Sequence, residues 1–210
     1  MKVKICGVTS EEIVTACAQA GAAYIGFNHF EKSPRFVTLE QVKALGALVP
    51  VGMCKVSLLV DPDDAFLDAL MEHAPIDMIQ LHGSETPERV LEVKARTGLP
   101  VMKVVGLSQS EDLAKIDLFA PVADQILVDA KAPQGSDLPG GNGVSFDWDL
   151  LAERRWSVPW MLAGGLTVEN VTEAVRRTGA DQVDVASGVE RAPGIKDMRR
   201  IEDFIAAAAR

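Results

Sequence analysis

The sequence is poor in the residues that build metal sites and disulfide frameworks. Among its 210 residues there are only three cysteines and three histidines. An odd number of cysteines without a CxxC pair argues against a disulfide framework and indicates a reducing, cytoplasmic setting. The histidines do not fall at metal-ligand spacings such as HxxxH, so we expect no bound metal.

Positive charge and long apolar runs are also scarce. The chain has 21 Lys and Arg residues against 30 Asp and Glu residues, a formal net charge of −9. Such a field repels nucleic acids and anionic lipids, so we expect neither as a partner, and an anion would need a local site. No stretch of about 18 apolar residues suggests a membrane span. The N-terminal segment Met1–Gly7 lacks the apolar region of a signal peptide.

What the sequence does contain is a short apolar run followed by a helical pattern, repeated eight times. The runs are rich in Val, Ile and Leu, as expected for strands covered on both faces. They are Lys2–Cys6, Ala23–Phe27, Gly52–Val60, Met78–Leu81, Val101–Val105, Gln125–Asp129, Pro159–Ala163 and Gln182–Ala186. Thr9–Glu12 and Thr86–Glu88 carry helix-start signals, and Gly21, Gly98 and Gly179 fall where helices should end.

Eight strand–helix units in this length predict a compact (β/α)₈ barrel, with residues 1–210 as a single domain. The local pattern of an open doubly wound sheet is the same, but the count of eight and the absence of GxGxxG after the first run favour the barrel. Residues 130–146 form a long glycine-rich interruption after the sixth run. Loops of that length are often functional lids, although a tolerated insertion also fits.

Candidate catalytic residues stand at the carboxyl ends of strands, where barrels carry their function. Lys4 and Cys6 share one face of the first strand. If that face is interior, the ammonium lowers the thiol pKa from about 8.5 and makes Cys6 a base; a buried structural cysteine fits equally. Asp129 ends the sixth strand, where partial burial would raise its pKa and suit a general acid, or where it acts as a structural acceptor. Gln80 and His82 share a face of the fourth strand, as substrate ligands or as a polar pair filling the barrel.

Small residues follow the last two strands. Gly164 and Gly165 end the seventh run, and Ser187 and Gly188 end the eighth. Such loops form the usual phosphate site of barrels, in which backbone N–H groups converge on the anion. Arg35 follows the second strand on the same rim and suits a carboxylate, although an exposed arginine without a partner is also common.

These motifs extend in order through nearly the whole chain. The segments are Lys4–Thr9, Gly26–Phe27, Lys32–Arg35, Gln80–Gly83, Leu127–Asp129, Gly140–Gly143, Phe146–Trp148, Ala163–Leu166, Asp184–Glu190 and Pro193–Asp197. Together they resemble the phosphoribosylanthranilate isomerase family of tryptophan biosynthesis. The resemblance implies a (β/α)₈ barrel that binds a small phosphorylated substrate, as a monomer or homodimer, without a metal or organic cofactor.

The resemblance also implies a reaction and a role for each site residue. The reaction is the Amadori rearrangement of N-(5-phosphoribosyl)anthranilate to 1-(2-carboxyphenylamino)-1-deoxyribulose 5-phosphate. Asp129 would protonate the furanose ring oxygen, Cys6 would remove the C2 proton, and Arg35 would bind the anthranilate carboxylate. The other implied ligands are Gln80, His82 and Asp184 for the substrate and Gly143, Gly164, Gly165, Ser187 and Gly188 for its phosphate.

Three positions depart from the family pattern without removing a proposed catalytic group. They are Asn28-His29 after the second strand, Asn142 in the glycine-rich loop, and Ala186 at the end of the eighth strand. Two alternatives remain: another phosphosugar barrel isomerase or epimerase, and a barrel that binds phosphate without turnover. A histidine-pathway isomerase resembles a barrel with aspartate in the place of Cys6, and an epimerase would call for a metal site. A binding module has no need of both an acid and a base.

Overall fold

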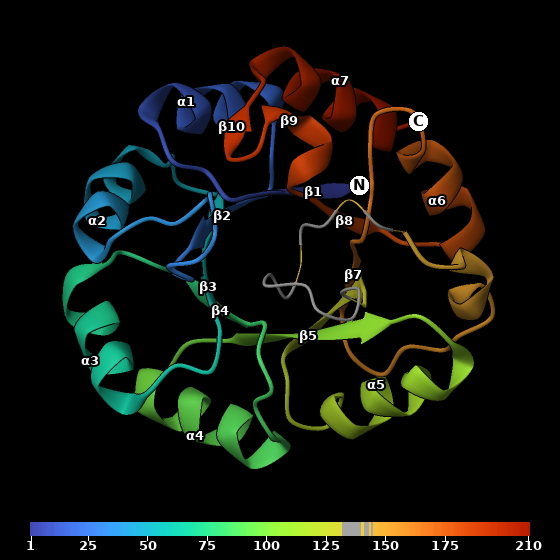
Figure 1. Cartoon of the computed structure of the whole chain (residues 1–210), viewed down its shortest axis with the longest axis horizontal. Helices are drawn as coiled ribbons and strands as arrows, with labels where there is room; N and C mark the ends of the chain where they lie inside the picture. The colour runs from blue at the N-terminus through green and yellow to red at the C-terminus, as the bar shows by residue number, and fades with distance from the viewer. Residues whose placement is uncertain (132–139, 141–142, 144) are drawn as a thin grey trace.

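Eight parallel strands close into a barrel in their sequence order, and β8 pairs with β1 (Figure 1). The computed structural model describes residues 1–131, 140, 143 and 145–210. The strands are β1 Lys2–Cys6, β2 Tyr24–Asn28, β3 Cys54–Leu59, β4 Met78–Leu81, β5 Val101–Leu107, β6 Gln125–Ala130, β7 Trp160–Leu162 and β8 Gln182–Val185. Closure confirms the predicted (β/α)₈ barrel and rules out the open sheet.

Helices cover the outside of the barrel (Figure 1). They are α1 Glu11–Ala20, α2 Leu39–Leu48, α3 Asp64–His73, α4 Pro87–Thr97, α5 Leu113–Phe119, α6 Val171–Thr178 and α7 Met198–Ala208. Three 3₁₀ turns, η1 Ser110–Asp112, η2 Trp148–Leu151 and η3 Ser187–Val189, and a small antiparallel hairpin, β9 Glu190–Ala192 with β10 Ile195–Lys196, complete the elements. No helix in these described parts of the chain is long and apolar enough to cross a membrane.

The helix ends follow the sequence signals closely. Gly21, Gly98 and Gly179 terminate α1, α4 and α6 in the left-handed conformation that glycine adopts without steric penalty. The Thr86 hydroxyl caps α4 by accepting a hydrogen bond from the backbone N–H of Arg89. Ser10 occupies the cap position of α1, but its side chain makes no capping hydrogen bond, so that part of the prediction is wrong.

The unit after β6 differs from the other seven. The sequence pattern predicts a helix there, whereas the helical element that the described residues contain is the single turn η2. Trp148 and Leu151 of this turn are buried against the barrel. Only eight residues separate η2 from β7, and Pro159 lies directly before that strand, so little chain is left for a full helix.

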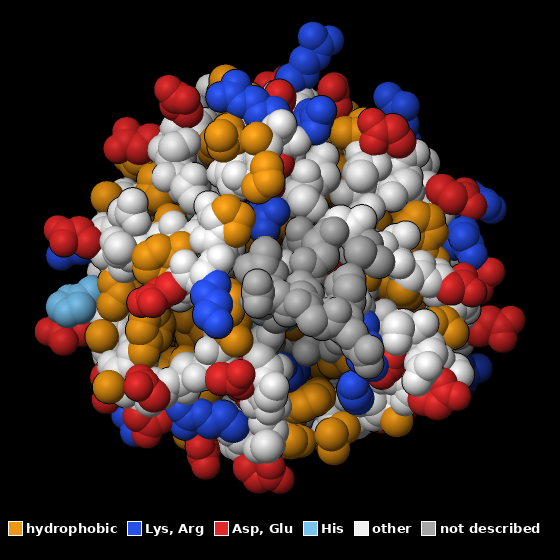
Figure 2. All heavy atoms as spheres, in the orientation of Figure 1, with side chains coloured by type: hydrophobic (Ala, Val, Ile, Leu, Met, Phe, Trp, Pro, Cys, Tyr) orange, Lys and Arg blue, Asp and Glu red, His pale blue; other side chains and the backbone are white. Residues whose placement is uncertain are grey.

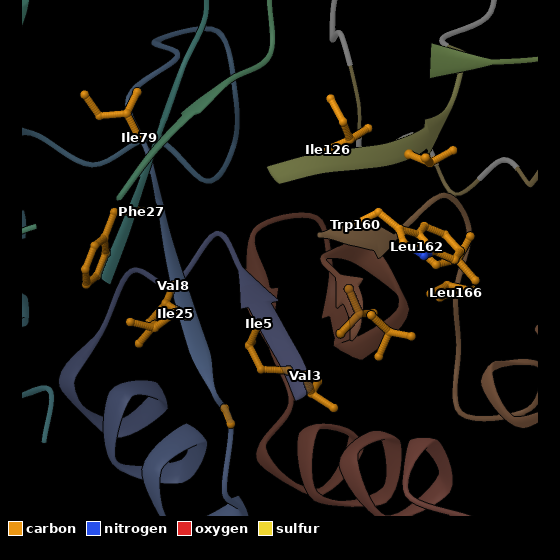
Figure 3. Close-up of a cluster of buried hydrophobic side chains, with 14 of the residues drawn as sticks. Val3, Ile5, Val8, Ile25, Phe27, Ile79, Ile126, Trp160, Leu162 and Leu166 are labelled. Atoms are coloured by element: carbon orange, nitrogen blue, oxygen red, sulfur yellow. The ribbon is translucent and has the colours of Figure 1, made fainter. Parts of the chain in front are cut away.

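Strand alternation divides the apolar side chains between two cores. Outward-facing residues such as Ile5 and Ile126 pack under the helices, in the large cluster drawn in Figure 3. A smaller cluster that includes Met102 and Leu127 fills the barrel interior. Because successive residues of a strand face opposite sides, Asp129 shares the inward face of Leu127. The same alternation places Lys4 and Cys6 on one face of β1, as the sequence predicted, and that face is the inward one.

Charged side chains of both signs are dispersed over the face of the molecule that Figure 2 shows. Asp and Glu side chains lie around the whole periphery, with Lys and Arg interspersed among them. This agrees with the excess of acidic residues in the sequence. Selective anion binding on this face therefore depends on local geometry rather than on a broad positive surface.

Candidate active site

One pocket at the carboxyl ends of the strands collects every site residue that the sequence predicted. Its lining includes Cys6, Arg35, Gln80, His82, Asp129, Gly143, Gly164, Gly165, Asp184, Ser187 and Gly188. Four of these residues lie in the strands β1, β4, β6 and β8, and the others lie in the segments that follow β2, β4, β6, β7 and β8. The barrel therefore gathers residues as far apart in the sequence as Cys6 and Gly188, as its closed topology requires.

A buried ion pair lies beside the candidate base. Lys4 Nζ donates a hydrogen bond to Asp184 Oδ1 at 2.9 Å, and the lysine is fully buried. The two residues are register partners on β1 and β8, which explains why their side chains meet. Burial alone favours a neutral amine, but the Asp184 carboxylate and Cys6 outweigh it, and the pKa of Lys4 is raised. Lys4 is thus a fixed positive charge beneath the pocket.

The pKa of the Cys6 thiol is raised, not lowered as the sequence suggested. Burial of the whole side chain is the largest cause, and the ammonium groups of Lys4 and Lys196 only partly oppose it. The neighbouring Asp184 carboxylate adds to the rise because it disfavours a second negative charge. The expectation that the nearby ammonium lowers this pKa and gives a thiolate at neutral pH is therefore wrong, and the structure favours a neutral Cys6 thiol.

Asp129 has the raised pKa expected of a general acid. Burial raises the pKa of this carboxyl to about 7, and the Asp184 carboxylate contributes in the same direction. The backbone N–H of Ala130, which donates to Oδ1 at 2.8 Å, opposes the shift. His82 Nε2 lies 3.6 Å from Oδ2. Near pH 7 about half of the molecules therefore hold a proton on Asp129.

The Gln80 side chain, which turns into the same pocket, carries an unsatisfied acceptor. It is 1% exposed, and its Oε1 makes no hydrogen bond within the described part of the chain. A buried acceptor without a donor is unfavourable in water-poor surroundings. A ligand hydroxyl or N–H group would satisfy it, which agrees with the substrate-binding role expected for Gln80.

The loops after β7 and β8 have the close packing of a backbone anion site. Gly164 and Gly165 take positive φ values of 87° and 62°. A Cβ atom added at Gly164 would lie 2.6 Å from the backbone nitrogen of Ala130, and one at Gly188 would lie 2.0 Å from the carbonyl oxygen of Leu166. Only glycine fits such approaches, so the backbone itself forms this part of the pocket wall.

Gly188→Ala is expected to weaken phosphate binding. The added methyl group would displace the loop after β8, raising KM by roughly tenfold or more and lowering the free energy of unfolding by about 1–3 kcal/mol. Steady-state kinetics and competition by inorganic phosphate measure the effect. Gly98→Ala is the control, because that glycine has positive φ but open space around it and terminates α4 outside the pocket. An unchanged KM for Gly188→Ala would contradict the phosphate assignment.

Arg35 is neither exposed nor unpaired, so that alternative is wrong. Its Nε and Nη2 donate to the two carboxylate oxygens of Glu190 at 2.7 and 2.9 Å. Its Nη1 makes no hydrogen bond within the described residues, and the side chain lines the pocket. Glu190 was not predicted as the partner of Arg35, because 155 residues separate the two. It occurred only in the motif Asp184–Glu190, with no role of its own.

The departures from the family pattern have local structural roles. Asn28 Nδ2 donates to Ser33 Oγ at 3.1 Å, and Ser33 Oγ accepts from the backbone N–H of Arg35 at 3.1 Å, so Asn28 helps to shape the turn that carries Arg35. His29 is buried beside Ser57, and burial lowers the pKa of the imidazole to about 4. Asn142 lies outside the described residues.

Comparison with known proteins identifies the family. The family model for N-(5'-phosphoribosyl)anthranilate (PRA) isomerase matches residues 3–207. The chain belongs to this family. An N-(5'-phosphoribosyl)anthranilate isomerase of Ruegeria sp. is 59% identical over 209 residues, 99% of this chain and 97% of the relative. The resemblance recognised from the motifs is thereby confirmed.

Solved structures of isomerases in this family share the fold. The phosphoribosyl anthranilate isomerase of Thermotoga maritima superposes with a TM-score of 0.89 at 31% identity, covering 100% of this chain and 98% of the other. A second isomerase structure, in complex with reduced 1-(o-carboxyphenylamino)-1-deoxyribulose 5-phosphate, gives 0.85 at 29% identity, with coverage of 100% and 98%. Membership of the isomerase family favours a catalytic barrel over a non-catalytic phosphate-binding one.

Proposed function

We propose that the chain catalyses the Amadori rearrangement of N-(5-phosphoribosyl)anthranilate to 1-(2-carboxyphenylamino)-1-deoxyribulose 5-phosphate in tryptophan biosynthesis, with Asp129 as the acid and Cys6 as the base. The observation that supports these roles is the presence of both groups in one pocket, on the inward faces of β6 and β1. A carboxyl that holds its proton near neutral pH and a buried thiol form a donor and acceptor pair.

Ring opening comes first in this mechanism. Protonated Asp129 gives its proton to the furanose ring oxygen, and the bond between that oxygen and C1 breaks. The lone pair of the anthranilate nitrogen fills the vacant orbital at C1, which gives a protonated Schiff base. The products of this step are the Asp129 carboxylate, the neutral sugar hydroxyl and the cationic Schiff base, so the charge balances.

Proton transfer at C2 follows. The Cys6 thiolate removes the C2 proton, the C–H pair forms a C1–C2 double bond, and the C1–N π pair returns to nitrogen. The enolamine then takes a proton at C1 and loses one from the C2 hydroxyl, which leaves the ketone. Because the substrate's own nitrogen accepts the electron pair, the chemistry needs no metal or organic cofactor.

The active protonation state is a minor tautomer of the resting pocket. Protonated Asp129 with ionised Cys6 contains the same number of protons as ionised Asp129 with neutral Cys6. The raised pKa of the thiol favours the second form, and the positive charges of Lys4 and Lys196 stabilise the Cys6 thiolate of the first. Lys4 also stabilises the Asp129 carboxylate of the second form, so Lys196 is the charge that selectively increases the fraction of molecules ready to react.

The remaining pocket residues bind the substrate in this proposal. Backbone groups at Gly143, Gly164, Gly165 and Gly188, with the Ser187 hydroxyl, hold the phosphate. The position of all five in one pocket and the close packing at Gly164 and Gly188 support this assignment. Arg35 binds the anthranilate carboxylate. Gln80, His82 and Asp184 contact the ribose-derived part, since all three line the same cavity.

Three further expectations belong to this proposal. Residues 1–210 form one barrel domain, in line with a family match that extends over residues 3–207. The protein acts in the cytoplasm, where reducing conditions keep Cys6 a free thiol, as it is in the structure. It works as a monomer or a homodimer, which sedimentation of the purified protein distinguishes.

Turnover of the anthranilate adduct is the decisive measurement. The pure folded chain, given freshly prepared N-(5-phosphoribosyl)anthranilate, is expected to abolish the fluorescence of the adduct at a rate proportional to protein concentration. Binding without loss of fluorescence would instead support the non-catalytic barrel. Turnover of another phosphosugar, with none of the adduct, would support the alternative isomerase or epimerase.

A further inference from the structure

A buried cluster of three charged side chains joins the pocket to the β9–β10 hairpin, whose two strands are labelled in Figure 1. Glu190 of β9 accepts hydrogen bonds from Arg35 Nε at 2.7 Å and Nη2 at 2.9 Å. The same carboxylate accepts from Lys196 Nζ of β10 at 2.8 Å. The side chains of Arg35, Glu190 and Lys196 are 7%, 4% and 1% exposed, so water screens their charges little.

Burial lowers the pKa of Lys196, and the Glu190 carboxylate opposes that shift. With Lys196 protonated, the cluster has one more positive charge than negative charge. Two cations share the single carboxylate of Glu190, within a chain whose formal net charge is −9. An uncompensated buried charge is unfavourable unless a counterion reaches it. Arg35 lines the pocket and its Nη1 is not bonded within the described residues, so the missing negative charge can be supplied from the pocket. A ligand carboxylate fits that requirement.

Lys196 also connects the cluster to the candidate phosphate loop. Its ammonium donates a second hydrogen bond, at 2.9 Å, to the carbonyl oxygen of Ala186, directly before Ser187 and Gly188. The hairpin turn is equally close to the chain before Arg35, because a Cβ atom at Gly194 would lie 2.4 Å from the carbonyl oxygen of Pro34. The hairpin therefore fixes the carboxylate end and the phosphate end of the pocket relative to each other.

We propose that Glu190 and Lys196 are positioning residues for the substrate carboxylate. Glu190 fixes the plane of the Arg35 guanidinium through two parallel hydrogen bonds. Lys196 offsets the negative charge of Glu190, so the positive charge of Arg35 is left to attract a ligand carboxylate. Neither residue touches the reacting atoms. The inference rests on the proposed function, in which Arg35 binds the anthranilate carboxylate. It adds the elements that make the pocket select a carboxylated aniline over aniline itself.

A pair of ligands tests this role directly. One is the reduced product analogue, which carries the carboxylate, and the other is the same compound with phenylamino in place of carboxyphenylamino. Calorimetry gives Kd for both ligands. The Kd of the phenylamino compound divided by the Kd of the carboxyphenylamino compound isolates the contribution of the carboxylate. Lys196→Met is expected to reduce this ratio roughly 2- to 30-fold, mainly by weakening the carboxylated ligand. Lys196→Arg retains the charge and is expected to keep most of the ratio.

Lys94→Met is the matched control. Lys94 Nζ also binds one carboxylate and one carbonyl, Asp124 Oδ1 at 2.9 Å and the Val122 oxygen at 3.2 Å, but it does not line the pocket. Its loss is expected to leave the ratio of the two Kd values at the wild-type level. Lys196→Gln covers the case in which the methionine variant does not fold, because glutamine keeps a hydrogen-bond donor while removing the charge.

The outcomes separate this inference from the proposed function. A wild-type protein that binds both ligands equally would remove the carboxylate role of Arg35, and with it the proposed substrate. The wild-type protein could instead prefer the carboxylated ligand while Lys196→Gln and any folded Lys196→Met keep the Kd ratio within about twofold of wild type. That result would overturn the positioning role and leave the proposed function intact. A ratio lost in these variants and restored in Lys196→Arg would support it.

Discussion

Asp129→Asn is expected to lower kcat by roughly 10²–10⁴-fold, because an amide cannot deliver the proton that opens the furanose ring. The substitution preserves the shape of the side chain and removes only its acidity. Single-turnover fluorescence of the anthranilate adduct measures the effect, since it reports chemistry apart from product release. Asp124→Asn is the control, because Asp124 directly precedes the same strand at the opposite end of the barrel. A kcat close to wild type would remove Asp129 as the acid.

The pH profile tests the same assignment without relying on the size of one rate. Below about pH 7 Asp129 is protonated, and kcat/KM is expected to rise about tenfold per pH unit as the Cys6 thiolate becomes more common. Above about pH 7 the loss of the Asp129 proton offsets that gain, so the profile levels off until Cys6 itself ionises. In Asp129→Asn the break near pH 7 should disappear. A profile that falls immediately above pH 7 would contradict the raised pKa of the thiol.

The stability of Asp129→Asn distinguishes lost chemistry from lost structure. The pKa of Asp129 is about 7 when folded, against an ordinary value of about 3.9 when unfolded. Between about pH 7 and pH 4 the folded wild-type chain therefore holds a proton on Asp129 that the unfolded chain does not. Its free energy of unfolding increases as the pH falls through that window. Relative to wild type, the asparagine variant is expected to be more stable at pH 8, with the advantage gone below pH 4. Denaturant unfolding at both pH values measures this.

Cys6→Ser is expected to abolish nearly all turnover, again by roughly 10²–10⁴-fold in kcat. A serine hydroxyl is far less acidic than a thiol, so the variant lacks a usable base, while the substrate-binding groups remain in place. Affinity for the reduced product analogue should consequently change much less than kcat. Cys17→Ser is the control, since Cys17 is equally buried but lies in α1 and does not line the pocket. Comparable losses in both variants would point to packing rather than catalysis.

Most of the barrel could be predicted because its strands are apolar, β-branched runs separated by clear helix signals. All eight strands occur where the sequence placed them, with ends displaced by a few residues. The third run, for example, was expected over Gly52–Val60 and is observed over Cys54–Leu59, since Gly52 adopts a φ of 98° that suits a turn. The described residues after β6 contain the turn η2 instead of the predicted helix, and only eight residues separate that turn from β7, which periodicity alone does not reveal.

The sequence predicted those features of the site that depend on local geometry. It did not predict the features that depend on contacts between residues far apart in the chain. Period-two alternation correctly placed Lys4 and Cys6 on one face of the first strand. The pairing of Arg35 with Glu190 depends on contacts across 155 residues, and no local pattern specifies it. The sign of the Cys6 pKa shift failed for a related reason. The cation one layer below was visible in the sequence, whereas complete burial and the Asp184 carboxylate were visible only in the folded barrel.

The seam between β1 and β8 has a consequence for folding. The ion pair of Lys4 with Asp184 joins residues 180 positions apart, so it forms only when the barrel closes. Such a contact is expected to form late in folding. The conformational entropy of the intervening chain must be lost before the contact can contribute any stabilisation. We therefore expect the charges around Cys6 to be assembled late in folding, when the barrel closes. Recovery of enzymatic activity during refolding reports closure itself, and an unclosed intermediate with native-like helices would be inactive.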